Sequence, residues 1–222
     1  MIRPSHVLLF VVALAAPLAA QEKKPGNRFE KEILAYEAAD KKSPPEPGAI
    51  LFAGASGIRL WKTLAQDFPE HRVLNRGFGG STIADAIHFA DRIIIPYQPK
   101  LIVLQSGGND LNGGKSPQQV ADDFAAFVAK VRGKLPEVPI VFMSIQPSPA
   151  RWSQVEKQKE TNALIRKLCE AGENLRYLNA FDAFLNADGQ PRGELFVDDK
   201  LHHNAAGYKV RAELVRPYLG QH

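Results

Sequence analysis

The chain of 222 residues contains a single cysteine, Cys169, which excludes an internal disulfide bond. No cluster of cysteine and histidine has the spacing of a zinc site, so we expect no metal and no other cofactor. Cys169 lies in "IRKLCEAGE" and is expected to be a small core residue on a helix.

Excess charge of one sign is also scarce. The formal net charge is +4, and loss of Arg3 with a leader segment would lower it by one. The sequence contains no block of Lys and Arg and no interleaving of basic with aromatic residues. We therefore expect no nucleic-acid partner.

Long apolar runs are missing after the first twenty residues. The segment "MIRPSHVLLFVVALAAPLAA" has Arg3 near its start, an apolar run from Val7 and small residues up to Ala20. This layout predicts a signal peptide over residues 1–20, cleaved before Gln21, and a protein exported to the periplasm or outside the cell. The run is short for a membrane span, and we expect no stable membrane insertion after its removal, although a retained anchor is the alternative.

Roughly 200 remaining residues suit one domain with a sizeable core. Residues 21–48 are interpreted as a tether followed by an N-terminal helix, because Phe29, Ile33 and Tyr36 recur at helical spacing. The breaker "KSPPEPG" ends this helix and leaves residues 49–222 as the domain.

Short apolar runs then alternate with helical segments. The runs are "AILFAGAS", "VLNRGF", "LIVLQSGG", "IVFMSIQ" and "LRYLNAF". The clearest helix is predicted over residues 117–134, where Ser116 and Gln119 form a capping box, and another begins at Ala205 after the cap Asn204. This alternation predicts an α/β fold with a five-stranded, mostly parallel sheet covered on both faces.

Parallel sheets of this kind carry their sites at the carboxyl ends of the strands. The first four strands are followed by "GASG", "GFGGST", "SGGND" and "SIQPSP". Tight turns alone would explain the glycines. They do not explain the added Ser and Asn, so these segments are candidates for a polar site.

One carboxylate and one imidazole share a short turn near the end of the chain. In "LFVDDKLHHNAAGY", Asp199 precedes His202 by three residues, which allows the carboxylate to fix the tautomer of the ring. The spacing alone is a weak signal, and Asp198 is a rival carboxylate. Only His202 has a carboxylate at such a short spacing within a turn. The other histidines compete poorly for this role: His6, His71, His88, His203 and His222.

A catalytic His and Asp need a nucleophile, and Ser56 is the candidate because it follows the first strand directly. The segment "GASGI" is not the G-x-S-x-G elbow, since Ile58 occupies the place of the second Gly. Ser81, interpreted as the cap of the next helix, and Ser106, at the end of a strand, are the alternatives.

Acyl transfer also requires donors that stabilise a developing oxyanion. Gly80 in "GFGGS" exposes its backbone N–H because it has no side chain, and Asn109 in "SGGND" has a side-chain amide. Each also has an ordinary interpretation as a turn residue.

Taken together, "FAGASGIRLW", "NRGFGGS", "GGND" and "DKLH" resemble the four blocks of the SGNH hydrolases, also called the GDSL-type esterase family. The similarity is greatest to the branch related to platelet-activating factor acetylhydrolase, and it extends from Ile50 to Leu219. It implies a three-layer flavodoxin-like sandwich, an SGNH hydrolase domain over residues 49–222, and ester hydrolysis without a metal.

The resemblance also implies a role for each residue. Ser56 is the nucleophile, His202 and Asp199 complete a catalytic triad, and the oxyanion hole comprises the N–H groups of Ser56 and Gly80 with the amide of Asn109. The family often has Asp where this chain has Ala55, a difference expected to alter loop rigidity rather than abolish activity. Four further residues look typical of the family and are interpreted as framework or pocket wall: Arg59, Trp61, Arg76 and Trp152.

The sequence thus predicts an exported serine ester hydrolase that forms an acyl-enzyme with short-chain acyl or acetyl esters of small molecules or glycans. A thioesterase or a lysophospholipase with the same residues is one alternative. An exported ligand-binding module without activity is another, against which the presence of all the site residues argues. The sequence does not indicate an oligomeric state.

Overall fold

The computed structural model of the chain describes residues 27–220, so the predicted signal peptide and the start of the tether lie outside the described part. The strands are β1 (Ile50–Gly54), β2 (Val73–Gly77), β3 (Leu101–Gln105), β4 (Ile140–Met143) and β5 (Leu175–Leu178). The α-helices are α1 (Glu30–Lys42), α2 (Ser56–Arg59), α3 (Leu64–Asp67), α4 (Ile83–Ile93), α5 (Gly108–Asn112), α6 (Pro117–Arg132), α7 (Val155–Ala171) and α8 (Ala205–Leu219).

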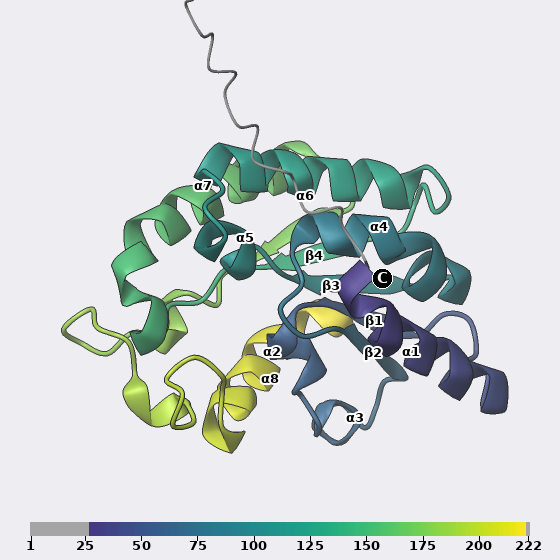
Figure 1. The fold of residues 1–222 in the computed structure, drawn as a ribbon, viewed down its shortest axis with the longest axis horizontal. Coiled ribbons are helices and arrows are strands. Elements are labelled where there is room, and N and C mark those ends of the chain that lie inside the picture. Colours follow the sequence, from purple (N-terminus) through teal and green to yellow (C-terminus); the bar gives the residue numbers. More distant parts are fainter. Residues whose placement is uncertain (1–26, 221–222) are drawn as a thin grey trace, which may run out of the picture.

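The strands form one sheet in the order β2-β1-β3-β4-β5, and every neighbouring pair is parallel (Figure 1). Each strand lies within one of the five predicted apolar runs, so the predicted α/β fold with a flavodoxin-like sheet is confirmed. The chain reverses its direction of travel across the sheet between β1 and β3. Ligand sites in such sheets lie at the carboxyl ends of the strands beside this switch point.

Helices cover both faces of the sheet, which makes the three layers visible in Figure 1. Leu51, Ile102 and Phe142 of the strands pack with α1, α4, α6 and α7, while Phe52 and Val103 face α2, α3 and α8. Strand residues that point to opposite faces are therefore both buried. This explains why the runs of β1, β3 and β4 are continuously apolar rather than alternating.

Side-chain caps start the helices α4, α6 and α8. Ser116 and Gln119 form the predicted capping box of α6, and the side chain of Asn204 accepts from the backbone N–H of Gly207 at 3.1 Å to start α8. The prediction that Ser81 caps α4 is wrong, because Thr82 is the cap. The Ser81 side chain instead turns inward, and its hydroxyl donates to the carbonyl oxygen of Phe78 at 2.9 Å.

The helix α1 is held against the rest of the protein by apolar and ionic contacts. Phe29, just before it, and Ile33 are buried in the same core as α4 and α6. Arg92 of α4 forms ion pairs with Glu30 at 2.8 Å and with Glu37 at 2.7 Å. These contacts hold α1 against α4, and the Tyr36 hydroxyl of α1 donates to the carbonyl oxygen of Gly77 at the carboxyl end of β2, which belongs to the site described below.

Two further features of the described residues bear on the sequence predictions. Cys169 is buried on α7, as expected. Among the helices of residues 27–220, none has the length and apolar character that crossing a membrane demands.

Candidate active site

Ser56, His202 and Asp199 meet at the carboxyl end of β1. Ser56 is the first residue of α2, directly after the strand, and its Oγ lies 2.8 Å from Nε2 of His202. The other ring nitrogen, Nδ1, lies 2.6 Å from Oδ2 of Asp199. The structure therefore brings the three predicted residues into one hydrogen-bonded chain, although Ser56 and His202 are 146 positions apart in sequence.

The approach of Ser56 to the site depends on the glycine at the end of β1. Gly54 has φ +141°, and a Cβ atom there would lie 2.0 Å from the carbonyl oxygen of Gln105 on β3. Only glycine fits between the two strands at this point. The chain thereby turns sharply from β1 into α2 and exposes the Ser56 side chain at the switch point.

The hydrogen bonds of Asp199 determine the tautomer of His202. Oδ1 of Asp199 accepts from the backbone N–H groups of Leu201 and His202, each at 2.9 Å. The bond from the backbone N–H of His202, followed by the bond from its ring, lowers the pKa of Asp199 to about 2. An ionised carboxylate only accepts, so Nδ1 carries the proton and Nε2 presents its lone pair to the Ser56 hydroxyl.

A tight turn holds this pair in place. Lys200, between Asp199 and His202, has φ +57°, and the backbone N–H of Val197 donates to the carbonyl oxygen of His202 at 2.9 Å. The carbonyl oxygen of Lys200 accepts from the backbone N–H of Ala150 at 3.1 Å, which ties the turn to the segment after β4.

The alternative residues do not occupy such positions. Asp198 is exposed and has no recorded hydrogen bond or ion pair within residues 27–220. The ring of His203 lies between Phe184 and Phe196, at centroid distances of 4.6 and 5.0 Å. Burial, with Arg211 and His202 nearby, lowers the pKa of His203 well below its ordinary value, so this ring is neutral.

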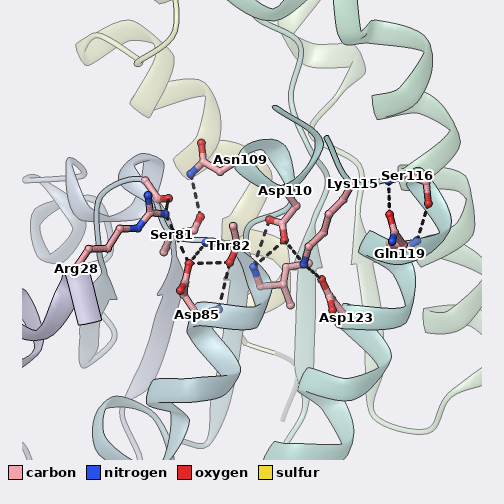
Figure 2. A network of polar contacts seen from close by, with 12 residues as sticks. Arg28, Ser81, Thr82, Asp85, Asn109, Asp110, Lys115, Ser116, Gln119 and Asp123 are labelled. Carbon is pink, nitrogen blue, oxygen red and sulfur yellow. Dashed lines mark hydrogen bonds and ion pairs between the residues drawn. The ribbon is translucent and has the colours of Figure 1, made fainter. Parts of the chain in front are cut away.

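Gly80 and Asn109 lie close together beside this chain. Nδ2 of Asn109 donates to the carbonyl oxygen of Ser81 at 2.9 Å, which places the amide next to the turn containing Gly80 (Figure 2). Gly80 has φ +76°, and its carbonyl oxygen accepts from Arg28 at 2.9 Å. Among the hydrogen bonds recorded for residues 27–220, the backbone N–H groups of Ser56 and Gly80 have no acceptor.

Arg151 fixes which way the Asn109 amide points. Its guanidinium group, which only donates, lies 2.8 Å from Oδ1 of Asn109. The amide nitrogen must therefore be the atom that faces the Ser81 carbonyl. Since that nitrogen has two hydrogens and Ser81 takes one, the second remains for another acceptor.

Sequence reasoning missed Arg151. It belongs to a 3-10 helix, η3 (Pro149–Gln154), and lies two positions after the segment "SIQPSP". Burial lowers its pKa from the ordinary value. In the sequence, a single Arg outside the strands looks like an ordinary solvated residue. Only the polar segment after β4 indicated that this region belongs to a site.

Three of the four residues interpreted as framework or pocket wall have contacts that define their places. Trp61 is buried, and its Nε1 donates to Asp67 at 2.6 Å. Arg76 is buried and pairs with Asp40 at 2.6 Å. Arg59 lines a hollow over Ser56 and pairs with Glu32 of α1 at 3.1 Å. Trp152 is half-buried in η3.

Ala55 occupies the position at which the SGNH hydrolases often have Asp. It is the residue that precedes α2, and it has no side-chain hydrogen bond to the helix. The start of α2 is therefore fixed by backbone contacts alone: the carbonyl oxygen of Ala55 accepts from Ile58 at 3.0 Å and from Arg59 at 3.1 Å.

Two hollows adjoin Ser56 and His202. The larger, of about 660 Å³, extends toward α1 and is lined there by Lys31, Glu32 and Ala35. The smaller, of about 70 Å³, extends between the carboxyl ends of β3 and β4. The arrangement offers a hydroxyl, an imidazole oriented to deprotonate it, and room for a bound molecule on both sides.

A buried carboxylate behind Asn109 links α4 to α6. Asp110 accepts from the backbone N–H of Ile83 at 3.2 Å and lies 3.4 Å from Nζ of Lys115, which also pairs with Asp123 (Figure 2). Burial raises the pKa of Asp110 from 3.8 to about 6. Between pH 3.8 and about 6, Asp110 is therefore protonated in the folded protein but ionised in the unfolded chain.

This shift predicts a pH-dependent stability difference between wild type and Asp110→Asn. The raised pKa favours folding below pH 3.8, and this contribution is lost as pH rises to about 6. Relative to Asp110→Asn, wild type should therefore lose up to about 3 kcal/mol of unfolding free energy across that range. Urea denaturation at several pH values checks it, with the exposed Asp122→Asn as control. A difference that does not change with pH would contradict the prediction.

Comparison with known proteins agrees with the fold. The chain is 25% identical over 205 residues to platelet-activating factor acetylhydrolase IB subunit alpha1 of Bos taurus, covering 86% of this chain and 82% of the relative. Over 89 residues it is 28% identical to esterase TesA of Pseudomonas aeruginosa, covering 40% of this chain and 44% of that one.

Solved structures have the same architecture. One described as a platelet activating factor from Streptococcus pneumonia superposes with a TM-score of 0.76 at 24% identity, covering 86% of this chain and 92% of that one. A GDSL-like lipase from Bacteroides thetaiotaomicron gives a TM-score of 0.66 at 18% identity, with coverage of 86% and 95%. A model of the GDSL-like lipase/acylhydrolase family matches residues 48–210, and the chain therefore belongs to that family.

Proposed function

We propose that the protein is an exported serine esterase that removes short acyl groups from small-molecule or glycan esters through an acyl-enzyme. The observation that supports this most is the chain from Asp199 through His202 to Ser56, with distances of 2.6 and 2.8 Å. Membership of the family supports hydrolysis of esters as the reaction. The roles of the individual residues are part of the proposal.

In the proposed reaction, Nε2 of His202 takes the proton of Ser56 as Oγ attacks the ester carbonyl carbon. The tetrahedral oxyanion accepts from the N–H groups of Ser56 and Gly80 and from the amide of Asn109. His202 then protonates the leaving alcohol as its C–O bond breaks. A water molecule, deprotonated by His202, attacks the acyl-enzyme. His202 then returns this proton to Oγ of Ser56 as the acyl C–O bond breaks and the acid is released.

The size of the smaller hollow supports short acyl groups over long ones. About 70 Å³ accommodates a group of a few heavy atoms, whereas the larger hollow of about 660 Å³ has room for an alcohol such as a sugar. A thioesterase or lysophospholipase with the same residues would need a longer apolar channel for its acyl chain.

A panel of substrates tests the proposed function. Acetyl, butyryl and octanoyl esters of one alcohol are compared with acetylated sugars and an acetyl thioester. We expect kcat/KM to be highest for the acetyl esters and to fall with chain length. A preference for octanoyl ester or for thioester would contradict the proposal, and no turnover with no fluorophosphonate labelling would indicate a binding module.

The oxyanion role of Asn109 makes a separate prediction. Its amide bonds strongly only after negative charge develops on the substrate oxygen, so Asn109→Ala should lower kcat roughly a hundredfold to a thousandfold and change KM little. Fluorophosphonate labelling should slow but persist, because Ser56, His202 and Asp199 remain.

Asn112→Ala is the matched control, since Asn112 ends the same helix α5 and its amide oxygen only accepts from Gln154 at 3.0 Å. It should keep near-normal kcat. Asn109 also bonds Ser81 and Arg151, so melting temperatures are measured beside the rates. An Asn109→Ala protein that melts earlier but keeps kcat per folded molecule would exclude the catalytic role.

Export is the remaining part of the proposal. It is supported by the apolar segment and the small residues before Gln21. Sequencing the amino terminus of the protein recovered from the cell envelope or the medium checks it. A mature chain that begins near Gln21 is expected, and a retained Met1 would indicate an anchor instead.

A further inference from the structure

The smaller hollow is lined by polar atoms that the fold leaves without partners. Gln105, Ser106, Ser148, Gln158 and His203 all line it. In each, a buried polar atom has no hydrogen-bond partner: Oε1 of both glutamines, Oγ of both serines and Nε2 of the histidine. Buried polar groups in native proteins are normally satisfied by protein, water or ligand, so these five atoms around one small space are available to hydrogen-bond a bound molecule.

These side chains are built into the core rather than placed at the rim. Ser106, Ser148 and Gln158 have exposed fractions of 1%, 4% and 1%. They come from three separate elements, after β3, before η3 and within α7. Because these residues come from the ends of two strands and from a helix, the polar wall does not depend on the conformation of a single loop.

The hollow is joined directly to the nucleophile. Ser56, Asn109 and His202 line both the smaller and the larger hollow. Oε1 of Gln105 lies so close to Gly57 that a Cβ atom there would be 2.6 Å from it. A group covalently attached to Ser56 would therefore meet the polar wall without leaving the site.

The five unpartnered atoms of the wall belong to neutral side chains. None of the described residues that line the smaller hollow is Asp, Glu or Lys, and the His203 ring is neutral. Arg151 is the one cation among them, and its guanidinium donates to Asn109. Amide oxygens accept, and serine hydroxyls both donate and accept. An uncharged group with a hydroxyl of its own matches this set.

We propose that the smaller hollow is an acyl subsite for short hydroxyacyl groups, with glycolyl as the simplest member. The proposal rests on the proposed esterase function and specifies its acyl group. A hydroxyl on the second carbon can donate to one buried amide oxygen and accept from a serine hydroxyl, whereas a methyl group at the same place can do neither. Sites that hydrogen-bond a substrate hydroxyl discriminate strongly against the analogue that lacks it.

The test compares ethyl glycolate with ethyl propionate, whose acyl groups have the same number of heavy atoms and differ by OH against CH₃. Each kcat/KM is divided by the rate constant for hydrolysis by hydroxide, which removes the difference in intrinsic reactivity. We expect the corrected ratio to favour glycolate about tenfold or more, which corresponds to at least one additional hydrogen bond. A corrected ratio near one, or in favour of propionate, would overturn the proposal and would fit a hollow that holds only water.

The variant Ser106→Ala distinguishes the loss of a contact to the acyl hydroxyl from a general loss of activity. It should lower kcat/KM for glycolate several-fold and leave propionate unchanged or faster, and Ser148→Ala is the second variant if the first does not fold. The exposed Ser153→Ala is the control and should leave the ratio intact. An equal loss on both substrates in both subsite variants would overturn the proposal.

Acetyl, propionyl and glycolyl esters together distinguish failure of the subsite from failure of the esterase function. Turnover of acetyl and propionyl esters that depends on Ser56, with no preference for glycolyl, refutes the subsite alone. Absence of turnover of all three esters refutes the esterase function and the subsite together.

Discussion

Ser56→Ala should yield a folded protein whose kcat for an acetyl ester is roughly 10⁵- to 10⁶-fold lower than that of wild type. No other described hydroxyl lies within hydrogen-bond distance of Nε2 of His202. The bound ester would then be attacked only by water, with the oxyanion donors still in place. Residual catalysis should therefore remain above the uncatalysed rate.

The fold should tolerate this change, because the Ser56 side chain bonds only to His202 among the described residues. Alanine is also acceptable in the first turn of a helix. Thermal melting should shift by no more than a few degrees. Ser153→Ala, an exposed serine on η3, serves as the control and should keep both kcat and melting temperature.

Labelling by a fluorophosphonate, followed by peptide mass mapping, identifies the nucleophile independently of any substrate. The label is expected on Ser56 in wild type and in Ser153→Ala, and on no residue of Ser56→Ala. Label on Ser81 or Ser106, or unchanged turnover in the purified Ser56→Ala protein, would exclude Ser56 as the nucleophile.

The strands of the sheet could be predicted because each one leaves its signal in a few consecutive residues. The strands β1, β3 and β4 are buried on both faces, so each appears in the sequence as a short run of apolar residues such as "LIVLQ" of β3. Parallel strands then bring their carboxyl ends to one edge. That rule alone placed the segments containing Ser56, Gly80 and Asn109 near one another.

The error at Ser81 shows where local reasoning fails. Ser81 and Thr82 both suit a helix cap, and the sequence alone does not distinguish them. The choice depends on the turn after Gly80, with φ +76°, which directs the Ser81 side chain toward the carbonyl oxygens of Phe78 and Gly54. Side-chain direction in an irregular turn is a tertiary property.

Three parts of the site had no sequence signal for the same reason. The contact of Arg151 with Asn109 spans 42 positions, and that of Arg28 with Gly80 spans 52. The polar wall of the smaller hollow combines residues at the end of β3, before η3, within α7 and before α8, and each looks like an ordinary polar position in the sequence. These side chains point toward one hollow because of how the layers pack. The sequence pattern does not reveal this packing.

Asp199→Asn should lower kcat about 10⁴-fold while leaving the turn intact. The amide oxygen of Asn still accepts from the backbone N–H groups of Leu201 and His202, which Asp199 bonds at 2.9 Å. The amide nitrogen, however, donates to Nδ1 of His202. The ring proton then resides on Nε2 and points at the Ser56 hydroxyl, so His202 no longer accepts the proton of Ser56.

Asp198→Asn is the matched control for this variant. It removes the same charge from the same turn, one residue earlier, and Asp198 is exposed. Because the pKa of Asp199 is about 2, its carboxylate stays ionised throughout the range in which activity is measured. A loss of activity near pH 5 in wild type must therefore come from another group.

Equal kcat values for Asp199→Asn and Asp198→Asn would refute the orienting role of Asp199. A fall of about 10⁴-fold in Asp199→Asn alone, with the same melting temperature as Asp198→Asn, would support it. The rate of fluorophosphonate labelling should fall in parallel, since this reaction also requires His202 to accept the Ser56 proton. If labelling stayed fast while turnover was lost, Asp199 would act on the later steps instead, in which His202 protonates the alcohol and activates water.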